Sequence, residues 1–256
     1  MKKLVKTFTT NNYILFTFGI IFVFLLWFIF SFSIGKNNLY FPNPIETIKE
    51  VFRLLQKKFI YQSIGWTLLR TLIGFSISFV SAMVFGLLAG NVKPIRTFLK
   101  PLITVLKSIP TAALVFLFLI MSGSRYAPIY IVFLLSFPIL YESFVGGVDS
   151  ITKDITDALR IDSQRKLDGL FKIKIPLAFP YVVVGLASSF ALSLKTEVMA
   201  EIITGGTDAG LGCAIQVYRN DDPTNLTPIF AISFIIIVFV LIVDLIGLIV
   251  RRKFEK

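Results

Sequence analysis

Several residue types on which enzymes and cofactor-binding proteins depend are missing or scarce in these 256 residues. There is no histidine, and Cys213 is the only cysteine. Such a chain cannot form an internal disulfide, a haem or zinc site of the usual kind, or a catalytic pair of histidine with serine or cysteine. The nucleotide-binding pattern G-x-x-x-x-G-K-[ST] is also absent. The sequence therefore predicts no enzyme and no cofactor, and assigns any nucleotide hydrolysis to another subunit.

Charged side chains are also scarce, at 16% of the chain, whereas 55% of the residues are hydrophobic. The mean hydropathy of +0.81 is typical of an integral membrane protein. Apolar stretches long enough to cross a bilayer as helices lie at 13–34, 67–90, 101–122, 127–147, 178–203 and 227–250. The first is too long for the apolar core of a signal peptide. The sequence therefore predicts an all-α, polytopic membrane protein with six transmembrane helices.

The net charge of +11 indicates membrane orientation rather than nucleic-acid binding. Of the 26 Lys and Arg residues, 17 fall in the segments that the predicted spans place on one side, at 1–12, 91–107, 148–177 and 251–256. Cytoplasmic loops of membrane proteins are enriched in these residues. We therefore expect both termini and the loop 148–177 to be cytoplasmic.

The segment between the first two spans predicts a short helix outside the membrane core. Asn43 can cap it, and Pro44 suits its first position. One face of it is apolar, which is typical of a helix lying on the membrane or on the bundle; the stripe comprises Ile45, Ile48, Val51, Phe52, Leu55 and Phe59. The predicted organisation is an N-terminal transmembrane helix with an outer amphipathic helix at 1–66, a transmembrane core at 67–250 and a cytoplasmic tail at 251–256.

The loop 148–177 and the residues just after it are dense in charge. The 27 residues from Asp154 to Pro180 carry nine charged side chains, so most of them must lie in water. Asp154 can cap one short amphipathic helix, and Asp162 or Ser163 a second, which Pro176 would end. Two such helices on the cytoplasmic side could dock on another protein, or the segment could be a solvated loop with incidental helix.

This loop resembles that of a known family. Asp157-Ala158-Leu159, then Ser163, then Ile175-Pro176 match the spacing of the cytoplasmic coupling loop in permease subunits of bacterial ATP-binding-cassette (ABC) importers, although Leu159 replaces an alanine and Ser163 a glycine. Three further stretches resemble the branch that serves sulfonates, taurine, nitrate and thiamine precursors: Pro-x-Pro at 42–44, Trp66 to Arg70 and Ile73 to Phe75. Met199 to Glu201, followed by Gly210 to Gly212, resembles the corresponding stretch of the family. The resemblance covers about residues 40–250.

The resemblance implies a permease subunit, multi-pass in the bacterial cytoplasmic membrane, that forms the translocation path for a small solute and performs no chemistry. It implies an ATP-binding subunit as partner, which binds the ATP, an extracytoplasmic substrate-binding protein, and a second copy of the chain. The ATPase-coupling contact would comprise Asp157, Ala158, Leu159, Ser163, Leu167, Ile175 and Pro176.

The candidates for the translocation path are Pro110, Lys195, Glu197 and Glu201. Pro110 lacks a backbone donor and predicts a kink in the third span. Ionisable residues within a span usually face the bundle interior, a partner charge or a wet cavity. On the fifth span Lys195 and Glu197 point to different sides, whereas Glu197 and Glu201 share a face. Either Glu201 lines a wet outward cavity, or it pairs with Arg70.

The second span carries a small residue at every fourth position, at Gly74, Ser78, Ala82, Gly86 and Gly90. Such a stripe lets another helix approach closely. We expect a packing surface there rather than a sliding or pore-lining seam.

Two other classes of protein remain possible on the sequence. A secondary transporter would use the intramembrane Lys and Glu residues for ion coupling, but should show inverted repeats, and we find none. An intramembrane enzyme would need a nucleophile and a base, and without histidine only Ser with Lys or paired carboxylates could serve.

Overall fold

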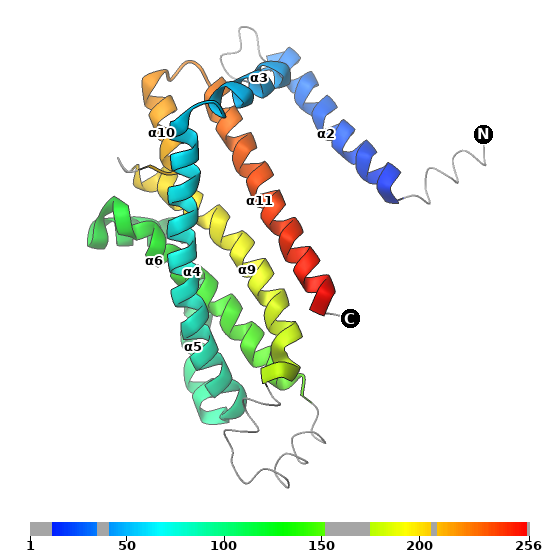
Figure 1. Ribbon diagram of the computed structural model, residues 1–256. Coiled ribbons are helices and arrows are strands. Elements are labelled where there is room, and N and C mark those ends of the chain that lie inside the picture. The colour runs from blue at the N-terminus through cyan, green and yellow to red at the C-terminus, as the bar shows by residue number, and fades with distance from the viewer. Residues whose placement is uncertain (1–11, 35–40, 152–174, 206–208, 255–256) are drawn as a thin grey trace, which may run out of the picture. The chain divides into compact units, whose positions relative to one another are not determined.

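A computed structural model of the protein describes residues 12–34, 41–151, 175–205 and 209–254, which form helices joined by short turns and bends (Figure 1). Two compact units are present. Among the described residues, one comprises 12–34, 41–58 and 215–235, and the other 59–151, 175–205, 209–214 and 236–254.

The first unit contains α2 (Asn12–Ile34), α3 (Pro44–Leu54) and the first part of α11 (Thr227–Phe254). Asn43 caps α3 as predicted, because its side-chain oxygen accepts a hydrogen bond from the Ile45 N–H at 2.9 Å. The predicted apolar stripe does not continue to Phe59 on one helix. The helix α3 ends at Leu54, and a turn over 55–57 precedes α4.

The second unit contains α4 (Lys58–Asn91) from its second residue onward, α5 (Lys93–Ser108), α6 (Thr111–Asp149) and α9 (Ile175–Thr204). It also holds the first turn of α10 (Leu211–Asp221), the rest of which belongs to the first unit, and α11 from Ile236 onward. Its main core lies between α4, α5, α6 and α9, and includes Ala82, Ala89, Leu99, Ile103, Phe137, Leu140, Tyr141, Phe144, Val145 and Val182.

The small-residue stripe of α4 is a packing surface against α6. A Cβ atom at Gly74 would lie 2.6 Å from the carbonyl oxygen of Ile129 and 2.9 Å from Cβ of Val132. At Gly86 it would lie 2.6 Å from Cβ of Phe144. The predicted close approach of another helix to this stripe is confirmed.

Four helical stretches in the described residues are long and apolar enough to cross a membrane, at Lys58–Asn91, Thr111–Asp149, Phe179–Thr204 and Thr227–Ile249. They coincide with the second, fourth, fifth and sixth predicted spans. A shorter apolar helical stretch, Thr17–Ser33, lies in α2, within the first predicted span.

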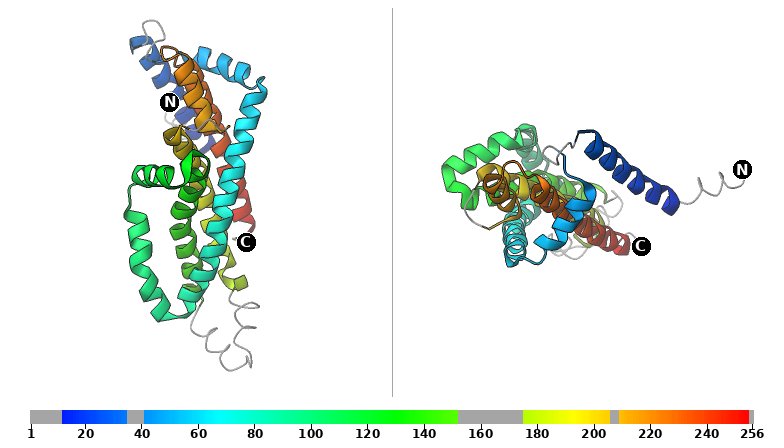
Figure 2. Two further views of the ribbon diagram at one scale, coloured as in Figure 1. Left: turned by 90° about the vertical axis from the view of Figure 1, so that its left-hand side faces the viewer. Right: turned by 90° about the horizontal axis from the view of Figure 1, so that it is seen from above.

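The third predicted span, 101–122, is wrong as a single helix. The helix α5 ends at Ser108, Ile109 is extended (φ −73°, ψ 129°), and α6 begins at Thr111. Pro110 has no N–H to donate and disfavours a helical conformation for the residue before it. The predicted boundary near residues 122–127 is a kink within α6 at Gly123 (φ 75°). After this kink, α6 turns and runs back through the unit (Figure 2).

Candidate functional site

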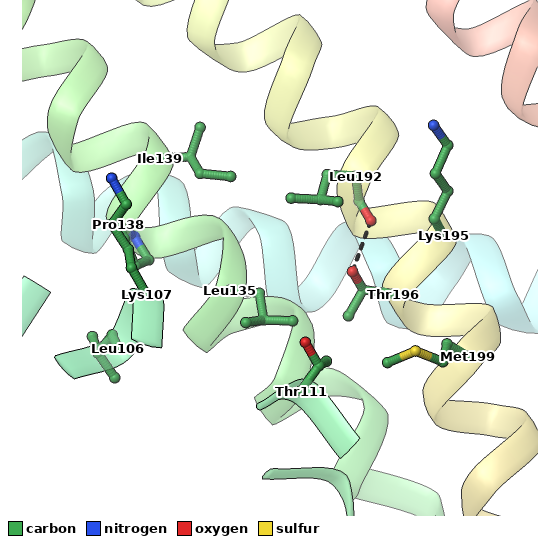
Figure 3. Close-up of a pocket in the computed structure, with 10 residues that line it drawn as sticks. All are labelled: Leu106, Lys107, Thr111, Leu135, Pro138, Ile139, Leu192, Lys195, Thr196 and Met199. Carbon is green, nitrogen blue, oxygen red and sulfur yellow. Dashed lines mark hydrogen bonds between the residues drawn. The ribbon is translucent and has the colours of Figure 1, made fainter. Parts of the chain in front are cut away.

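A hollow of about 400 Å³ opens beside the interruption of the third predicted span. The residues on both sides of Pro110 contribute to it, together with the second half of α6 and one side of α9 (Figure 3). Its wall is mostly apolar, and it is lined by Leu106, Lys107, Thr111, Leu135, Pro138, Ile139, Leu192, Lys195, Thr196 and Met199.

Two lysines give the hollow its charge, and only one of them is neutralised. Lys107 Nζ donates to the two carboxylate oxygens of Glu142 at 2.8 and 2.9 Å, and both side chains are about half exposed. Lys195 is exposed, and its side chain makes no hydrogen bond or ion pair within the described part of the chain. The hollow therefore carries one unbalanced positive charge.

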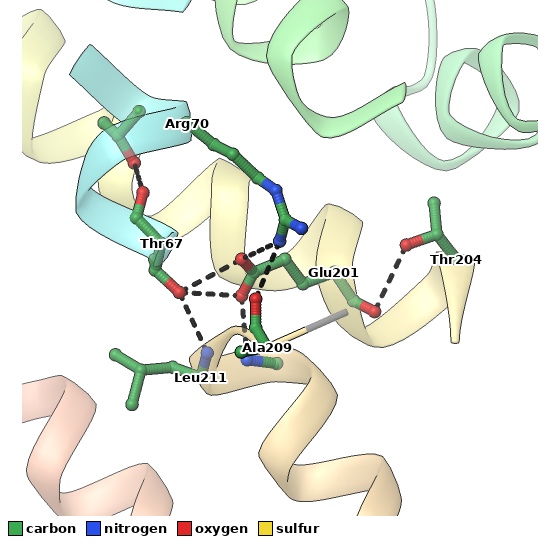
Figure 4. A network of polar contacts seen from close by, with 8 residues as sticks. Thr67, Arg70, Glu201, Thr204, Ala209 and Leu211 are labelled. Carbon is green, nitrogen blue, oxygen red and sulfur yellow. Dashed lines mark hydrogen bonds and ion pairs between the residues drawn. The ribbon is translucent and has the colours of Figure 1, made fainter. Parts of the chain in front are cut away.

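A second polar cluster, which we call the Arg70–Glu201 clamp, is buried between α4, α9 and the start of α10 (Figure 4). Arg70 Nη1 donates to Glu201 Oε1 at 3.0 Å, and Thr67 Oγ1 lies 3.0 and 2.9 Å from the two carboxylate oxygens. The Gly212 N–H donates to Glu201 Oε2 at 2.9 Å. Glu201 has no exposed surface. Of the two interpretations that the sequence allowed, pairing with Arg70 is the arrangement present.

The clamp also holds the backbone at the start of α10. Arg70 Nη1 donates to the carbonyl oxygen of Ala209 at 3.1 Å, and the Leu211 N–H donates to Thr67 Oγ1 at 2.8 Å. Side chains at Gly210 and Gly212 would collide with Glu201. The two glycines therefore leave the space that lets the Gly212 N–H reach the carboxylate.

Glu197 lies one turn before Glu201 on α9 and is also fully buried. Neither of its carboxyl oxygens has a hydrogen-bond partner among the described residues. Lys195 lines the hollow, whereas Glu197 is enclosed within the bundle. The prediction that these two residues point to different sides of their helix is confirmed.

The predicted ATPase-coupling residues fall mostly outside the described part of the chain, which excludes Asp157, Ala158, Leu159, Ser163 and Leu167. Ile175 is the first residue of α9, and Pro176 is exposed in its first turn. Pro110 is the N-cap residue of α6 and adjoins the hollow through its neighbour Thr111. The coupling role of this loop stays a prediction.

Two ion pairs that the sequence does not predict join α5 to α6. Lys107 pairs with Glu142, and Arg96 makes a bidentate pair with Asp149 at 3.0 and 2.8 Å. The hydrogen bonds to Asp149 raise the pKa of Arg96. Lys107 and Glu142 are 35 positions apart in the chain, and Arg96 and Asp149 are 53 positions apart. The one available signal was a set of complementary charges near the predicted ends of two neighbouring spans.

A helical membrane protein with an interrupted helix and a charged hollow beside it fits the class of membrane transport proteins. The sequence profile of the family described as "Binding-protein-dependent transport system inner membrane component" matches residues 82–256, and the chain belongs to this family.

Curated relatives agree with this assignment. The nitrate import permease protein NrtB of Leptolyngbya laminosa is 28% identical over 220 residues, which cover 82% of this chain and 77% of the relative. The bicarbonate transport system permease protein CmpB of Synechococcus elongatus is 28% identical and covers 76% and 73% of the two chains. The putative aliphatic sulfonates transport permease protein SsuC of Bacillus subtilis is 23% identical, with 72% and 66% covered.

Solved structures share the fold. One is a crystal structure of an amino acid ABC transporter with histidines, at 18% identity and a TM-score of 0.66, covering 78% of this chain and 96% of that chain. An inward-facing MetNI methionine ABC transporter gives 17% identity and a TM-score of 0.66, with 77% and 97% covered. The protein is therefore a multi-pass permease subunit of a bacterial ABC importer, not an enzyme. Its family implies an ATP-binding subunit and a substrate-binding protein as partners.

Proposed function

We propose that this permease imports a small oxyanion and that the hollow around Lys195 is part of its translocation path. The observation that carries the proposal is the placement of the charges of α9. Lys195 lines the hollow, whereas Glu197 and Glu201 are fully buried. On sequence alone, the two glutamates of this helix argue against an anionic substrate. Because neither of them lines the hollow, they do not repel an anion there.

The physical setting strengthens the attraction of Lys195 for an anion. The wall around it is mostly apolar, and a charge interacts more strongly where the effective dielectric constant is lower than that of water. The N-terminal end of α6 at Thr111 also adjoins the hollow, and that end of a helix carries partial positive charge. Interrupted helices recur at the substrate sites of membrane transporters.

The substrates named for the relatives point to the same class of solute. Nitrate, bicarbonate and aliphatic sulfonates are all oxyanions. Among the substrates that the sequence suggested for this branch, an oxyanion fits the unbalanced lysine best.

Replacing Lys195 with glutamine tests this proposal. Proteoliposomes holding the permease, its ATP-binding subunit and excess binding protein would be assayed for uptake of nitrate, bicarbonate and an alkanesulfonate. We expect uptake of the carried anion to fall about tenfold or more, the effect of losing a hydrogen bond to a charged group. Lys195→Arg should retain most of it, because it keeps the charge.

Lys58→Gln is the matched control, because Lys58 is exposed and does not line the hollow. It should leave uptake unchanged. Normal uptake by the Lys195→Gln complex, or a wild-type complex that carries none of these anions, would reject the proposal.

A homodimer would complete the path. The hollow is open to one side, and the nearby first turns of α6 expose Phe116, Leu117, Ile120 and Met121. In a membrane such apolar residues can face lipid as well as another helix, so the homodimer rests on symmetry: closed twofold symmetry is the commonest arrangement of identical subunits. The mass of the purified importer should correspond to two copies of this chain, and a complex with one copy beside a different permease would contradict the homodimer.

The excess of Lys and Arg in 1–12, 91–107, 148–177 and 251–256 supports cytoplasmic termini and a cytoplasmic coupling loop. The ATP-binding subunit that the family implies would dock on this loop and bind the ATP. A cysteine placed at Gln164 should react with an impermeant thiol reagent only from the cytoplasmic side, and more slowly when the ATP-binding subunit is present. The native Cys213 is buried and gives little background. Labelling from outside intact cells would contradict the orientation, and labelling unaffected by the partner would contradict the docking.

A further inference from the structure

We propose that Glu197 is a proton-binding site, a carboxylic acid held neutral inside the bundle beside the Arg70–Glu201 clamp. This inference goes beyond the transported solute and is independent of it.

The first observation is that Glu197 has no exposed surface and no hydrogen-bond donor. Both carboxyl oxygens lack a partner among the described residues. Moving an isolated carboxylate from water into an apolar interior costs far more than moving the neutral acid, so such a group takes up a proton. No hydrogen bond from this part of the chain offsets the cost of a negative charge on Glu197.

The second observation is the balance of charge. Within the described residues, the charged neighbours of Glu197 are Glu201, one turn further along the same helix, and Arg70 of α4, which pairs with Glu201. One guanidinium can neutralise one carboxylate, and two carboxylates that share a buried site cannot both ionise without strong repulsion. With Glu197 protonated, the three residues carry no net charge.

The hydrogen bonds decide which of the two carboxyl groups is ionised. Glu201 faces the donors of the clamp: Arg70 Nη1, the Thr67 hydroxyl and the Gly212 N–H. These donors favour the ionised form of the group that they contact. Glu197 has no such donor and therefore holds the proton.

Infrared spectroscopy of the purified permease complex tests this assignment. In a detergent without ester carbonyl groups, the wild-type spectrum should contain a carbonyl stretch of a protonated carboxylic acid that is lost in Glu197→Gln. Glu142→Gln is the matched control, because Glu142 is exposed and paired with Lys107, and it should lose no such band. An acid band of equal size in wild type and Glu197→Gln overturns the proposal.

Thermal stability provides an independent measurement. We expect the melting temperature of Glu197→Gln to stay within about 2 °C of the wild type at neutral pH, because glutamine replaces one neutral group by another. A folded state that binds a proton which the unfolded state releases loses stability as the pH rises. The wild type should therefore lose more stability than Glu197→Gln between neutral and alkaline pH. A large destabilisation of Glu197→Gln at neutral pH, or parallel pH profiles of the two proteins, would contradict a protonated Glu197.

Discussion

Replacing Glu201 with glutamine should lower the melting temperature of the permease complex by roughly 6–20 °C, the shift expected for a loss of about 3–5 kcal/mol in a chain of this size. Glutamine keeps one acceptor oxygen but puts an amide where the second carboxylate oxygen meets its donors. The guanidinium of Arg70, which is almost completely buried, would then lack its countercharge. Thermal unfolding of the purified complex measures the effect.

The same substitution at Glu142 is the matched control. Its ion pair with Lys107 is half exposed, and pairs exposed to solvent contribute about 0–1 kcal/mol. We expect Glu142→Gln to shift the melting temperature by no more than roughly 4 °C. Equal shifts for the two variants would mean that the clamp contributes no more than an exposed pair.

Gly74→Ala should destabilise the protein by about 1–3 kcal/mol, the usual effect of overpacking a well-packed core. The added methyl carbon would meet the backbone oxygen of Ile129 at 2.6 Å and the branched side chain of Val132 at 2.9 Å. Neither neighbour can rotate away, so α4 and α6 would have to separate. Thermal unfolding, and the yield of folded protein in the membrane, measure the effect.

Gly65→Ala provides the opposite case on the same helix. Nothing lies within 4 Å of a Cβ atom at Gly65, and alanine is favoured over glycine within a helix by about 0.5–1 kcal/mol. Gly65→Ala should therefore be neutral or stabilising. Destabilisation of similar size in the two variants would indicate a general intolerance of α4 to alanine rather than a packing contact at Gly74.

The class of protein could be predicted from the sequence because the relevant signals are local. Apolar runs of bilayer length can be recognised without knowing which helices lie beside them. The unequal distribution of Lys and Arg can also be read from the sequence alone, and it predicts an orientation of the chain that is still to be measured. The same holds for the small-residue stripe of α4, whose spacing already predicted close packing against another helix. The absence of histidine excluded haem and zinc sites of the usual kind and catalytic pairs of histidine with serine or cysteine. The resemblance to the family rested on short stretches of consecutive residues, such as Met199 to Glu201, which can be recognised without a structure.

The tertiary structure decided which charged residues meet and where helices break. The sequence allowed Glu201 either a wet cavity or a partner, and only the approach of α4 and the Gly-Leu-Gly turn to α9 decided for the pair with Arg70. The pair of Lys107 with Glu142 forms because α6 kinks at Gly123 and runs back past α5. Hydropathy cannot reveal such contacts, because they join distant parts of the chain. Similarly, Pro110 predicted a kink, but its local effect alone could not distinguish a bent helix from two helices with a hollow beside the break.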